Sequence, residues 1–390
     1  MATTTPEFDP LTLGFELHEQ LASGNRCAGF LFGAGTSICS GLPDLNRLSV
    51  EVASKLTTDQ RAQYDVLRSG GRNLETILNV VRGIREILSG SETLYGLSHA
   101  AARDLDIAIC RAIYEVISDG SPKPSAAHVS LSNWLKHFHS DSPVEIFTTN
   151  YDLLFESAFE SGGVPYFDGF VGAVQPFFVP QSIDPLTHAD SARNVPPPSW
   201  VRLWKLHGSV GWCYANDATS LQKRIVRMTG LGSKPTDEVV IFPSRDKYSE
   251  SRRLPYLTYM DRLRRFLTSG ERIFVVCGYS FGDEHINEVL RQALQSNVRL
   301  AMHALFFDTI PDHARAIATH YANLSALGRD TVVIGGVTGN WSLPTRKPAA
   351  GEVWHFWDGA KNAFALGDFT ALGAFLGSMM RPKPLVSVAP

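Results

Sequence analysis

The sequence predicts an α/β protein whose core is a Rossmann-like, doubly wound parallel sheet with an all-α helical insertion lobe. Short runs rich in Val, Ile and Phe end in glycine or polar turns, which is typical of buried strands in a parallel sheet. Helical patterns follow most of these runs, and one long stretch, 48–139, shows helical periodicity without a strand-like run. Alternating strands and helices indicate a doubly wound sheet, and the strand-free stretch indicates an insertion.

The expected strands share a run of branched or aromatic residues between turn residues. In chain order they are Ala28–Phe32, Val144–Thr148, Val201–Leu206, Val239–Phe242, Arg272–Cys277, Ala301–Phe307 and Thr331–Gly335. The expected helices Leu153–Phe159, Glu284–Leu294 and Asp312–Leu327 repeat apolar residues at three- and four-residue spacing. A helix thus follows several of the strands, as crossover connections between parallel strands require.

The chain divides into a helical lead-in at 1–27, a main domain at 28–340 with the insertion at 48–139, and a tail at 341–390. Within the insertion, Leu74–Leu88 and Leu105–Val116 each place apolar residues on one helical face, so we expect an all-α lobe. The tail carries Trp341, Trp354 and Trp357. The lobe and these tryptophans are candidate contact surfaces for a partner, and ordinary core packing is the alternative.

The bulk composition describes a folded protein without a strong overall field. The chain has 390 residues, of which 44% are hydrophobic and 19% charged, with a formal net charge of -3. That balance gives no general attraction to nucleic acid. The sequence shows no secretory signal pattern and no apolar run of the ~20 residues that a membrane helix needs, so we expect a cytoplasmic protein without membrane contact. The 5 cysteines include no C-x-x-C pair, which removes the sequence argument for structural zinc.

Four polar clusters each directly follow an expected strand. They are Gly33-Ala34-Gly35-Thr36-Ser37, Thr148-Thr149-Asn150-Tyr151-Asp152, Lys205-Leu206-His207-Gly208-Ser209 and Gly278-Tyr279-Ser280-Phe281-Gly282-Asp283. Ligands of open α/β sheets bind in the crevice beyond the carboxyl ends of the strands. The clusters therefore predict one shared pocket.

The first cluster, Gly33–Ser37, joins a strand to an expected helix. Glycines there let the backbone approach a phosphate, and exposed N–H groups meet its charge. The cluster lacks the full dinucleotide fingerprint, because Ile38 stands where the third glycine would be. A tight strand-to-helix turn without a ligand is the alternative interpretation.

The next two clusters supply the candidate catalytic residues. Asn150 offers an amide that can position water or a carbonyl, and Asp152 a carboxylate that can stabilise positive charge. Asp152 also stands where it could cap the helix that follows. His207 precedes a glycine turn after a strand, and an ordinary imidazole suits a general base near neutral pH.

In this order, the clusters resemble the sirtuin superfamily and its divergent prokaryotic-type branch. The resemblance rests on Gly33–Ser37, Gly41-Leu42-Pro43-Asp44, Thr148–Asp152, Leu206-His207-Gly208 and Gly278-Tyr279-Ser280. It spans roughly Phe30 to Gly335 and implies that the main domain binds NAD. In that reading the turn of Gly33, Ala34, Gly35, Thr36 and Ser37 holds the pyrophosphate, and the loop with Pro43 and Asp44 covers the nicotinamide ribose.

The resemblance also implies where the remaining site residues lie. Asn150 and Asp152, with the neighbouring Thr149, would lie beside the nicotinamide, and His207 beside its ribose. Gly278 and Ser280 would hold the phosphate and adenosine side of NAD. Asp308, at the end of the next strand, would accept the hydroxyls of the adenine ribose.

Three departures from sirtuin deacylases shape the expected activity. The chain has no paired cysteines for a zinc module, Leu45 and Asn46 replace an aromatic residue and an arginine, and Thr149 replaces a glutamine. They favour NAD hydrolysis, in which the nicotinamide–ribose bond breaks through an oxocarbenium-like transition state. Asn150 would orient water or the ribose, His207 would accept a proton, and Asp152 would hold the leaving carboxamide. A protein deacylase and a non-catalytic module that binds NAD or ADP-ribose are the alternatives.

The resemblance further implies a biological setting. Members of this branch resemble bacterial anti-phage effectors that deplete NAD, often as large homo-oligomers and sometimes with a HerA-type ATPase partner. The sequence itself offers one basic segment, Arg252–Arg265. It is interpreted as the solvated side of an amphipathic helix with Leu257, Met260, Leu263 and Phe266 on its apolar side, and nucleic-acid contact is the alternative.

Overall fold

The core of the fold is a mostly parallel sheet of ten strands, in the order β1-β15-β14-β13-β12-β11-β2-β3-β7-β4. The computed structural model describes residues 5–89, 91–138, 140–183, 196–216, 223–228, 239–241, 254–343 and 353–380. Strand β2 lies at the centre, between β3, which follows it in the chain, and β11, which comes much later. The strand order reverses there, which creates the crevice where doubly wound proteins bind ligands. The predicted α/β class is confirmed.

Six strands form the parallel centre of this sheet, and each consists mainly of buried apolar residues. They are β2 (Cys27–Phe32), β3 (Glu145–Thr148), β7 (Val201–Lys205), β11 (Arg272–Cys277), β12 (Leu300–Leu305) and β13 (Leu324–Leu327). At one edge, β4 (Tyr166–Phe167) pairs in parallel with β7. At the other edge, β14 (Thr331–Ile334) and β15 (Val337–Trp341) form an antiparallel hairpin, and β1 (Glu7–Phe8) pairs in parallel with β15. Their register places Phe32, Thr148, Lys205 and Cys277 at one edge of the sheet.

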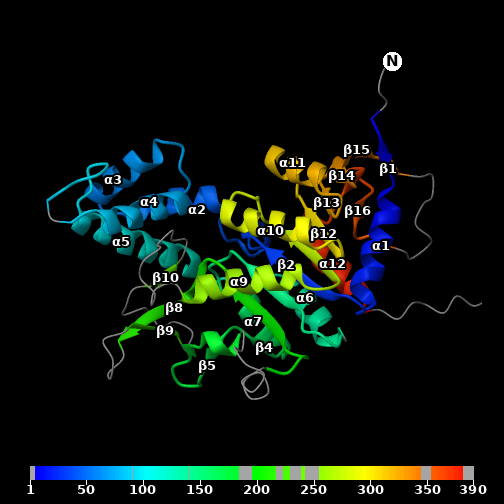
Figure 1. Ribbon diagram of the computed structural model, residues 1–390, viewed down its shortest axis with the longest axis horizontal. Helices are drawn as coiled ribbons and strands as arrows, with labels where there is room; N and C mark the ends of the chain where they lie inside the picture. Colours follow the sequence, from blue (N-terminus) through cyan, green and yellow to red (C-terminus); the bar gives the residue numbers. More distant parts are fainter. Residues whose placement is uncertain are drawn as a thin grey trace, which may run out of the picture.

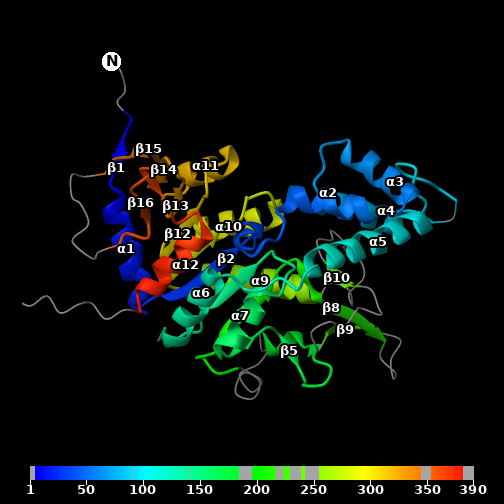
Figure 2. The ribbon, with the colours of Figure 1, turned by 180° about the vertical axis from the view of Figure 1, so that it is seen from behind.

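Helices cover both faces of the sheet. One face carries α9 (Leu254–Thr268), α10 (Glu284–Ser296) and α11 (Asp312–His320); the other carries α1 (Pro10–Ala22), α6 (Ala126–His137), α7 (Leu154–Gly162) and α12 (Phe369–Ser378). Figure 1 looks onto α9 and α10, and Figure 2 looks onto α6, α7 and α12. Because successive strand residues point to opposite faces, Phe274 and Val276 join one core while Ile273 and Val275 join the other.

The insertion folds largely into a separate helical lobe. It contains α2 (Leu45–Lys55), α3 (Thr58–Arg68), α4 (Leu74–Ile87) and α5 (His99–Ser118), which project away from the sheet in Figures 1 and 2. Each helix begins at a capping side chain whose oxygen accepts a backbone N–H: Asp44, Thr57, Asn73 and Ser98. The lobe buries its apolar faces in its own core. The end of the predicted range, α6, packs instead against α7 and α12 beside the sheet.

A second, antiparallel sheet combines strands from before and after β7 and was not predicted. Its order is β10-β8-β9-β6-β5, with β8 (Gly208–Asn216), β9 (Lys223–Arg227), β10 (Val239–Ile241), β6 (Phe177–Phe178) and β5 (Phe170–Val171). Placing Val239–Phe242 in the parallel sheet was therefore wrong, because β10 pairs antiparallel with β8; Phe242 lies outside the described residues. A single helix over Asp312–Leu327 was also wrong, since α11 ends at His320 and β13 begins at Leu324.

The described part of the tail packs into the core. The hairpin of β16 (Trp357–Asp358) and β17 (Ala363–Phe364) precedes α12. Trp354 and Trp357 are buried in the core on the α12 side of the sheet, and Trp341 stacks on Phe364. Core packing, rather than a contact surface, thus accounts for these tryptophans.

The basic segment folds as the amphipathic helix α9. Met260, Leu263 and Phe266 are buried, whereas Leu257 is exposed, so its placement on the apolar side was wrong. Arg262 forms an ion pair with Glu145, and Arg264 forms one with Asp261. Arg252 and Arg253 lie outside the described residues. None of the helices in the described ranges combines the length and the apolar character needed to cross a membrane.

Candidate functional site

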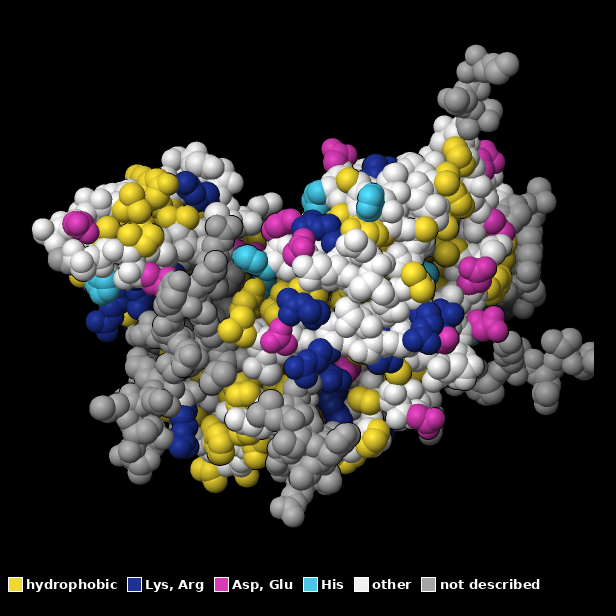
Figure 3. Space-filling model, viewed as in Figure 1, with side chains coloured by type: hydrophobic (Ala, Val, Ile, Leu, Met, Phe, Trp, Pro, Cys, Tyr) yellow, Lys and Arg dark blue, Asp and Glu magenta, His cyan; other side chains and the backbone are white. Residues whose placement is uncertain are grey.

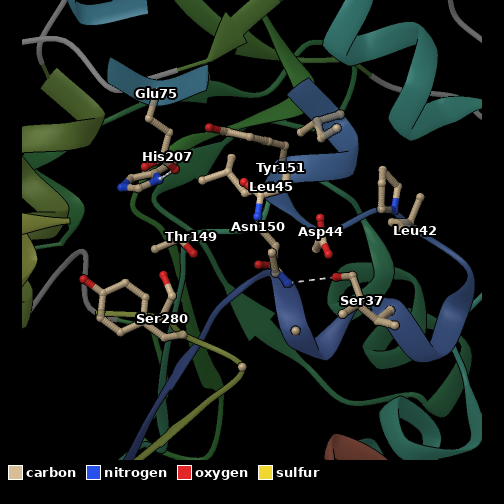
Figure 4. Close-up of a pocket in the computed structure, with 18 of the residues that line it drawn as sticks. Ser37, Leu42, Asp44, Leu45, Glu75, Thr149, Asn150, Tyr151, His207 and Ser280 are labelled. Carbon is tan, nitrogen blue, oxygen red and sulfur yellow. Dashed lines mark hydrogen bonds and ion pairs between the residues drawn. The ribbon is translucent and has the colours of Figure 1, made fainter. Parts of the chain in front are cut away.

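The four polar clusters line one cleft of about 400 Å³ between the carboxyl ends of the central strands and the helical lobe. The sheet side of the cleft consists of residues that follow β2, β3, β7 and β11. They are Ala34, Gly35, Ser37, Ile38, Thr149, Asn150, Tyr151, Asp152, His207, Gly278, Tyr279, Ser280, Gly282 and Asp283. The lobe side consists of the loop before α2 and of residues on or beside α2, α4 and α5: Leu42, Pro43, Asp44, Leu45, Asn46, Leu48, Asn73, Glu75 and Ile117. Figure 4 shows several of these side chains in the cleft.

The glycine turn after β2 differs from the predicted phosphate loop. It forms two 3-10 turns, η1 (Ala34–Thr36) and η2 (Ile38–Ser40), and not the start of an α-helix. The N–H groups of Gly33 and Gly35 donate to the carbonyls of Cys277 and Gly278, and those of Thr36 and Ser37 donate within the turn. The expectation that these N–H groups are free to meet a phosphate was therefore wrong for these four residues.

The glycines of this turn are explained by its contact with the loop after β11. A Cβ atom on Gly33 would lie 2.4 Å from the carbonyl oxygen of Gly278, and one on Gly35 would lie 2.7 Å from its Cα. Gly278 itself has a φ of +69°, in the left-handed region that glycine adopts without strain. Two cleft-forming loops thus pack backbone to backbone, which fixes the floor of the cleft.

Asn150 is held in one orientation by two hydroxyl groups. Its Nδ2 donates to Thr36 Oγ1 at 3.0 Å and to Ser37 Oγ at 2.8 Å. Each hydroxyl uses its own proton elsewhere: Thr36 donates to the Gly33 carbonyl and Ser37 to Asp152. The amide must therefore turn its NH2 group to the hydroxyls. Asn150 Oδ1 is left as a buried acceptor without a partner among the described residues.

Asp152 lies at the other end of this hydrogen-bond chain. Its Oδ2 accepts from Ser37 Oγ at 2.6 Å, and its Oδ1 accepts from the Leu154 N–H at 3.0 Å. The helix-capping alternative is thus present in the structure, since Asp152 satisfies an N–H at the start of α7. Its backbone carbonyl accepts from the buried Lys205, which also pairs with Glu156 at 2.9 Å. Asp152 thus lines the cleft while hydrogen bonds from Ser37, the Leu154 N–H and Lys205 fix its position.

His207 is almost completely buried between two carboxylates. Its Nδ1 lies 3.1 Å from Glu75 Oε1, and its Nε2 lies 2.9 Å from Asp283 Oδ2. Burial alone would lower the pKa of His207, but the charges of Glu75 and Asp283 and their hydrogen bonds raise it to about 10. The imidazole that the sequence analysis expected to titrate near neutral pH is thus paired with a carboxylate on each nitrogen, and this pairing favours its charged form.

The charge of the cleft is dominated by carboxylates. Asp44, Glu75, Asp152 and Asp283 line it, and His207 pairs with two of them, Glu75 and Asp283. Neither Lys nor Arg contributes to the lining in the described part of the chain. Burial would raise the pKa of Asp283, but the hydrogen bond and charge of His207 and two backbone N–H groups lower it to about 2. Such a cleft favours a ligand that carries or develops positive charge.

The remaining predicted binding residues fall into three groups. Pro43, Asp44, Thr149 and Ser280 line the cleft, and Asp44 also caps α2 by accepting from the Arg47 N–H. Gly33 and Thr36 lie behind the lining, where Thr36 is completely buried. Asp308 is exposed after β12 and is absent from the lining formed by the described residues.

Glu75 and the partner role of Asp283 were missed by the sequence analysis. Asp283 is the last residue of the fourth polar cluster, and the sequence analysis gave it no role. Its position just before an expected helix at the edge of the sheet was a signal that could have identified it. Glu75 is 132 residues from His207 in the chain. Its local pattern is that of the solvated side of an amphipathic helix, so no local signal points to it. Within the described residues, no group of three or more His, Cys, Asp or Glu side chains is arranged to hold a metal ion.

Comparison with protein families links this geometry to a known domain. Residues 144–327 match the family model described as a SIR2-like domain. The match covers the strands from β3 to β13 and therefore includes Asn150, Asp152, His207, Gly278 and Ser280. The glycine turn after β2 and the helical lobe lie before it.

Comparison with curated proteins gives no match. Among solved structures, similar chains include a Sir2 homologue in complex with NAD, at 14% identity and a TM-score of 0.41, covering 80% of this chain and 87% of that one. A mutant Sir2 homologue in complex with ADP-ribose has 14% identity and a TM-score of 0.39, covering 76% and 86%. Sir2 bound to an acetylated peptide has 14% identity and a TM-score of 0.35, covering 75% and 86%.

Proposed function

We propose that the protein hydrolyses NAD at the nicotinamide–ribose bond and releases nicotinamide and ADP-ribose. The observation that carries the proposal is the buried, unpartnered Oδ1 of Asn150, a residue that lines the cleft together with Asp152 and His207. Because Thr36 and Ser37 fix the amide, this oxygen can accept a hydrogen bond from a ribose hydroxyl or from the attacking water without reorganising. Preorganised acceptors of this kind orient the reacting groups.

The carboxylates of the cleft support the same reaction. In NAD the nicotinamide ring is cationic, and positive charge moves onto the ribose as the glycosidic bond breaks. Asp152 and Asp44 lie where they can stabilise that charge, and both carboxylates are already ordered by backbone or hydroxyl donors. Fixed charges in a cleft shielded from water act more strongly than they do in solution.

The proposal has NAD enter the cleft with its nicotinamide-ribose end. For the phosphates, the N–H groups of Gly33, Gly35, Thr36 and Ser37 are engaged within the protein, and we propose the hydroxyls of Thr149 and Ser280 as donors, since both line the cleft. We keep Asp308 as the proposed partner of the adenine ribose. Ser280→Ala should raise KM for NAD with little change in kcat, because it removes binding far from the reacting bond.

The test is a product assay on the purified full chain. Incubation with NAD should release nicotinamide and ADP-ribose, and Asn150→Ala should reduce the rate by about a hundredfold or more. The matched control is Asn25→Ala, because Asn25 is exposed at the opposite edge of the sheet before β2. Separate detection of cyclic ADP-ribose distinguishes hydrolysis from cyclisation. Equal rates for Asn150→Ala and the wild type would contradict the proposed function.

A second candidate is a non-catalytic module that binds NAD or ADP-ribose. It is favoured by one observation, the double pairing of His207 that holds the imidazole as a cation. Tight nucleotide binding without turnover at any pH would support this candidate. Release of O-acetyl-ADP-ribose from an acetyl-peptide would instead identify a deacylase.

The wider biological role belongs to the same proposal. We propose a cytoplasmic anti-phage effector that depletes NAD, assembles as a homo-oligomer and takes a separate HerA-type ATPase as its partner. The helical lobe is the contact surface we favour, because Val66 and Ile87 are exposed there and hydrophobic side chains gather over α3 and α4 in Figure 3. Light scattering of the pure chain tests the oligomer, and a monomer at micromolar concentration would contradict it.

A further inference from the structure

His207 has two carboxylate partners that differ in how firmly they are held. Asp283 caps α10, where its Oδ1 accepts from the N–H groups of His285 at 2.7 Å and Ile286 at 3.3 Å. Its Oδ2 is thereby aimed at His207 Nε2. Moving Asp283 would break a helix cap as well as an ion pair, which makes it the fixed partner.

Glu75 is the less constrained partner. It lies in the first turn of α4, on the lobe side of the cleft, and reaches across to His207 (Figure 4). Within the described residues, His207 is the single hydrogen-bond partner recorded for its carboxylate. Its side chain is 19% exposed, against 9% for Asp283 and 1% for His207. A ligand that enters the cleft meets Glu75 first.

We propose that Glu75 occupies the catalytic nitrogen of His207 in the free protein, and that a ribose hydroxyl of the substrate replaces it at Nδ1 while Asp283 remains on Nε2. Asp283 is then the positioning residue of the imidazole, and Glu75 is an exchangeable partner supplied by the helical lobe. The inference rests on the proposed function, because it takes the ribose of NAD as the incoming group.

The proton balance follows from the same geometry. In the free protein the imidazolium donates one N–H to each carboxylate. When Glu75 leaves, His207 loses the carboxylate that held its Nδ1 proton, its pKa falls, and that proton passes to solvent water. His207 is then neutral, retains its Nε2 proton toward Asp283, and presents the Nδ1 lone pair to the ribose hydroxyl, whose proton it accepts as charge develops on the sugar.

The other titratable groups around His207 do not compete for this proton. Tyr151 follows β3, with its ring 6.5 Å from that of His207, Tyr256 lies on α9 and Tyr279 follows β11. Burial and the charges of the nearby carboxylates raise the pKa of all three phenols above the ordinary range. They stay neutral while His207 titrates, so a change in activity near the pKa of His207 reports the imidazole.

Kinetics over a range of pH separate the two carboxylates. For the wild type, kcat/KM should rise with pH toward about 10, the pKa of His207 in the free protein, while kcat should level off at lower pH because Glu75 is displaced in the complex. Glu75→Gln should move the rise of kcat/KM to lower pH by about one unit or more and leave the kcat profile in place. Asp283→Asn should lower kcat by roughly 10²- to 10⁴-fold across the range. The control is Glu115→Gln, because Glu115 is exposed on α5 of the same lobe.

Histidine NMR tests the exchange without turnover. In long-range 1H–15N spectra, with His207 assigned by substitution, Glu75→Gln should lower the His207 pKa, and ADP-ribose should lower it in the wild type but not in Glu75→Gln. An unchanged pH profile and His207 titration in Glu75→Gln, or His207 signals that neither NAD nor ADP-ribose moves, would overturn the inference. Signals that move without any product formed would leave it standing and contradict the hydrolase proposal alone.

Discussion

The side chains at the centre of the cleft form a directed chain of hydrogen bonds. Asn150 donates to Ser37, and Ser37 donates to Asp152, so one serine sets the direction of both candidate catalytic groups. A hydroxyl with one proton can serve both only in this order. The position of Asn150 Oδ1 therefore depends on a residue that need not touch the substrate.

Removing that hydroxyl should disorder both groups. Ser37→Ala leaves Asn150 with Thr36 alone and takes one donor from the Asp152 carboxylate. A lost hydrogen bond to a charged group costs about 1.5–3 kcal/mol, so we expect kcat for NAD to fall roughly ten- to a hundredfold. Ser40→Ala is the matched control, because Ser40 lies on the next turn outside the cleft lining. Wild-type kinetics for Ser37→Ala would show that the chain is dispensable.

The paired His207 also predicts how stability depends on pH. Its pKa is about 10 in the folded protein against an ordinary value of 6.5, so folding favours the protonated form. The stabilisation is complete below pH 6.5 and is lost as pH rises through 10. The melting temperature of the wild type should therefore fall toward that of His207→Gln between these pH values. A constant difference between the two proteins from pH 6 to 10.5 would contradict the pairing.

Sequence analysis could identify site residues that stand out in their own short stretch of sequence. It failed for Glu75, which joins the site from a distant part of the chain. Asn150, Asp152 and His207 stand in short polar clusters directly after apolar strands, and that context is visible in one window of sequence. The pKa of His207 is raised by Asp283 and by Glu75, and Glu75 lies 132 residues away, on the helical lobe. No rule of spacing connects a carboxylate in the first turn of a lobe helix to a histidine at the sheet edge.

At the level of elements, the cleft floor consists of two loops whose backbones touch. Gly33 and Gly35 after β2 pack against Gly278 after β11, and hydrogen bonds from their N–H groups join the loops. The glycine pattern that suggested phosphate binding thus has a structural cause in this contact. A ligand in the cleft would contact a fixed edge where the strand order reverses, because the N–H groups of Gly33 and Gly35 are already used between the two loops.

A methyl group between these loops should separate them. Gly35→Ala places a Cβ 2.7 Å from the Gly278 Cα, and such overpacking costs about 1–3 kcal/mol. We expect a lower urea midpoint and loss of NAD hydrolysis. The matched control is Gly83→Ala in α4, where a Cβ meets nothing within 4 Å and should stabilise the helix by about 0.5–1 kcal/mol. Equal midpoints for the two variants would contradict the loop contact.

The strands that the sequence predicted well are buried on both faces. Strands β2 and β11 are nearly continuous apolar runs, and β3 and β7 carry a shorter apolar core beside buried polar residues. The second sheet escaped the sequence analysis, although Val210, Trp212 and Tyr214 alternate along β8 with smaller residues. The sequence analysis assigned β13 to the helix before it, because Leu324 and Leu327 continue the spacing of the apolar residues of α11.

At the level of the whole molecule, the cleft is shared by the sheet and the helical lobe, whose core also takes in Tyr151, Leu154 and Val210 from the sheet side. The sheet and its covering helices contribute Asn150, Asp152 and His207, whereas the lobe contributes Asp44 and Glu75. The ion pair between Glu75 and His207 spans the two. Any ligand that fills the cleft must contact both the sheet side and the lobe side, so ligand binding should affect residues on both sides.

Hydrogen exchange of the full chain can measure that coupling. Saturating ADP-ribose, at about 100 times its Kd, should stabilise the bound form by ~2.7 kcal/mol. Exchange should slow both at Asn73–Thr76, where α4 begins, and at Gly278–Asp283, after β11, because the nucleotide lies between them. Asn150→Ala is the control for specificity, since it should weaken protection on both sides together. Protection confined to the sheet side would contradict a cleft closed by the lobe, and would mean that Glu75 acts on His207 without meeting the ligand.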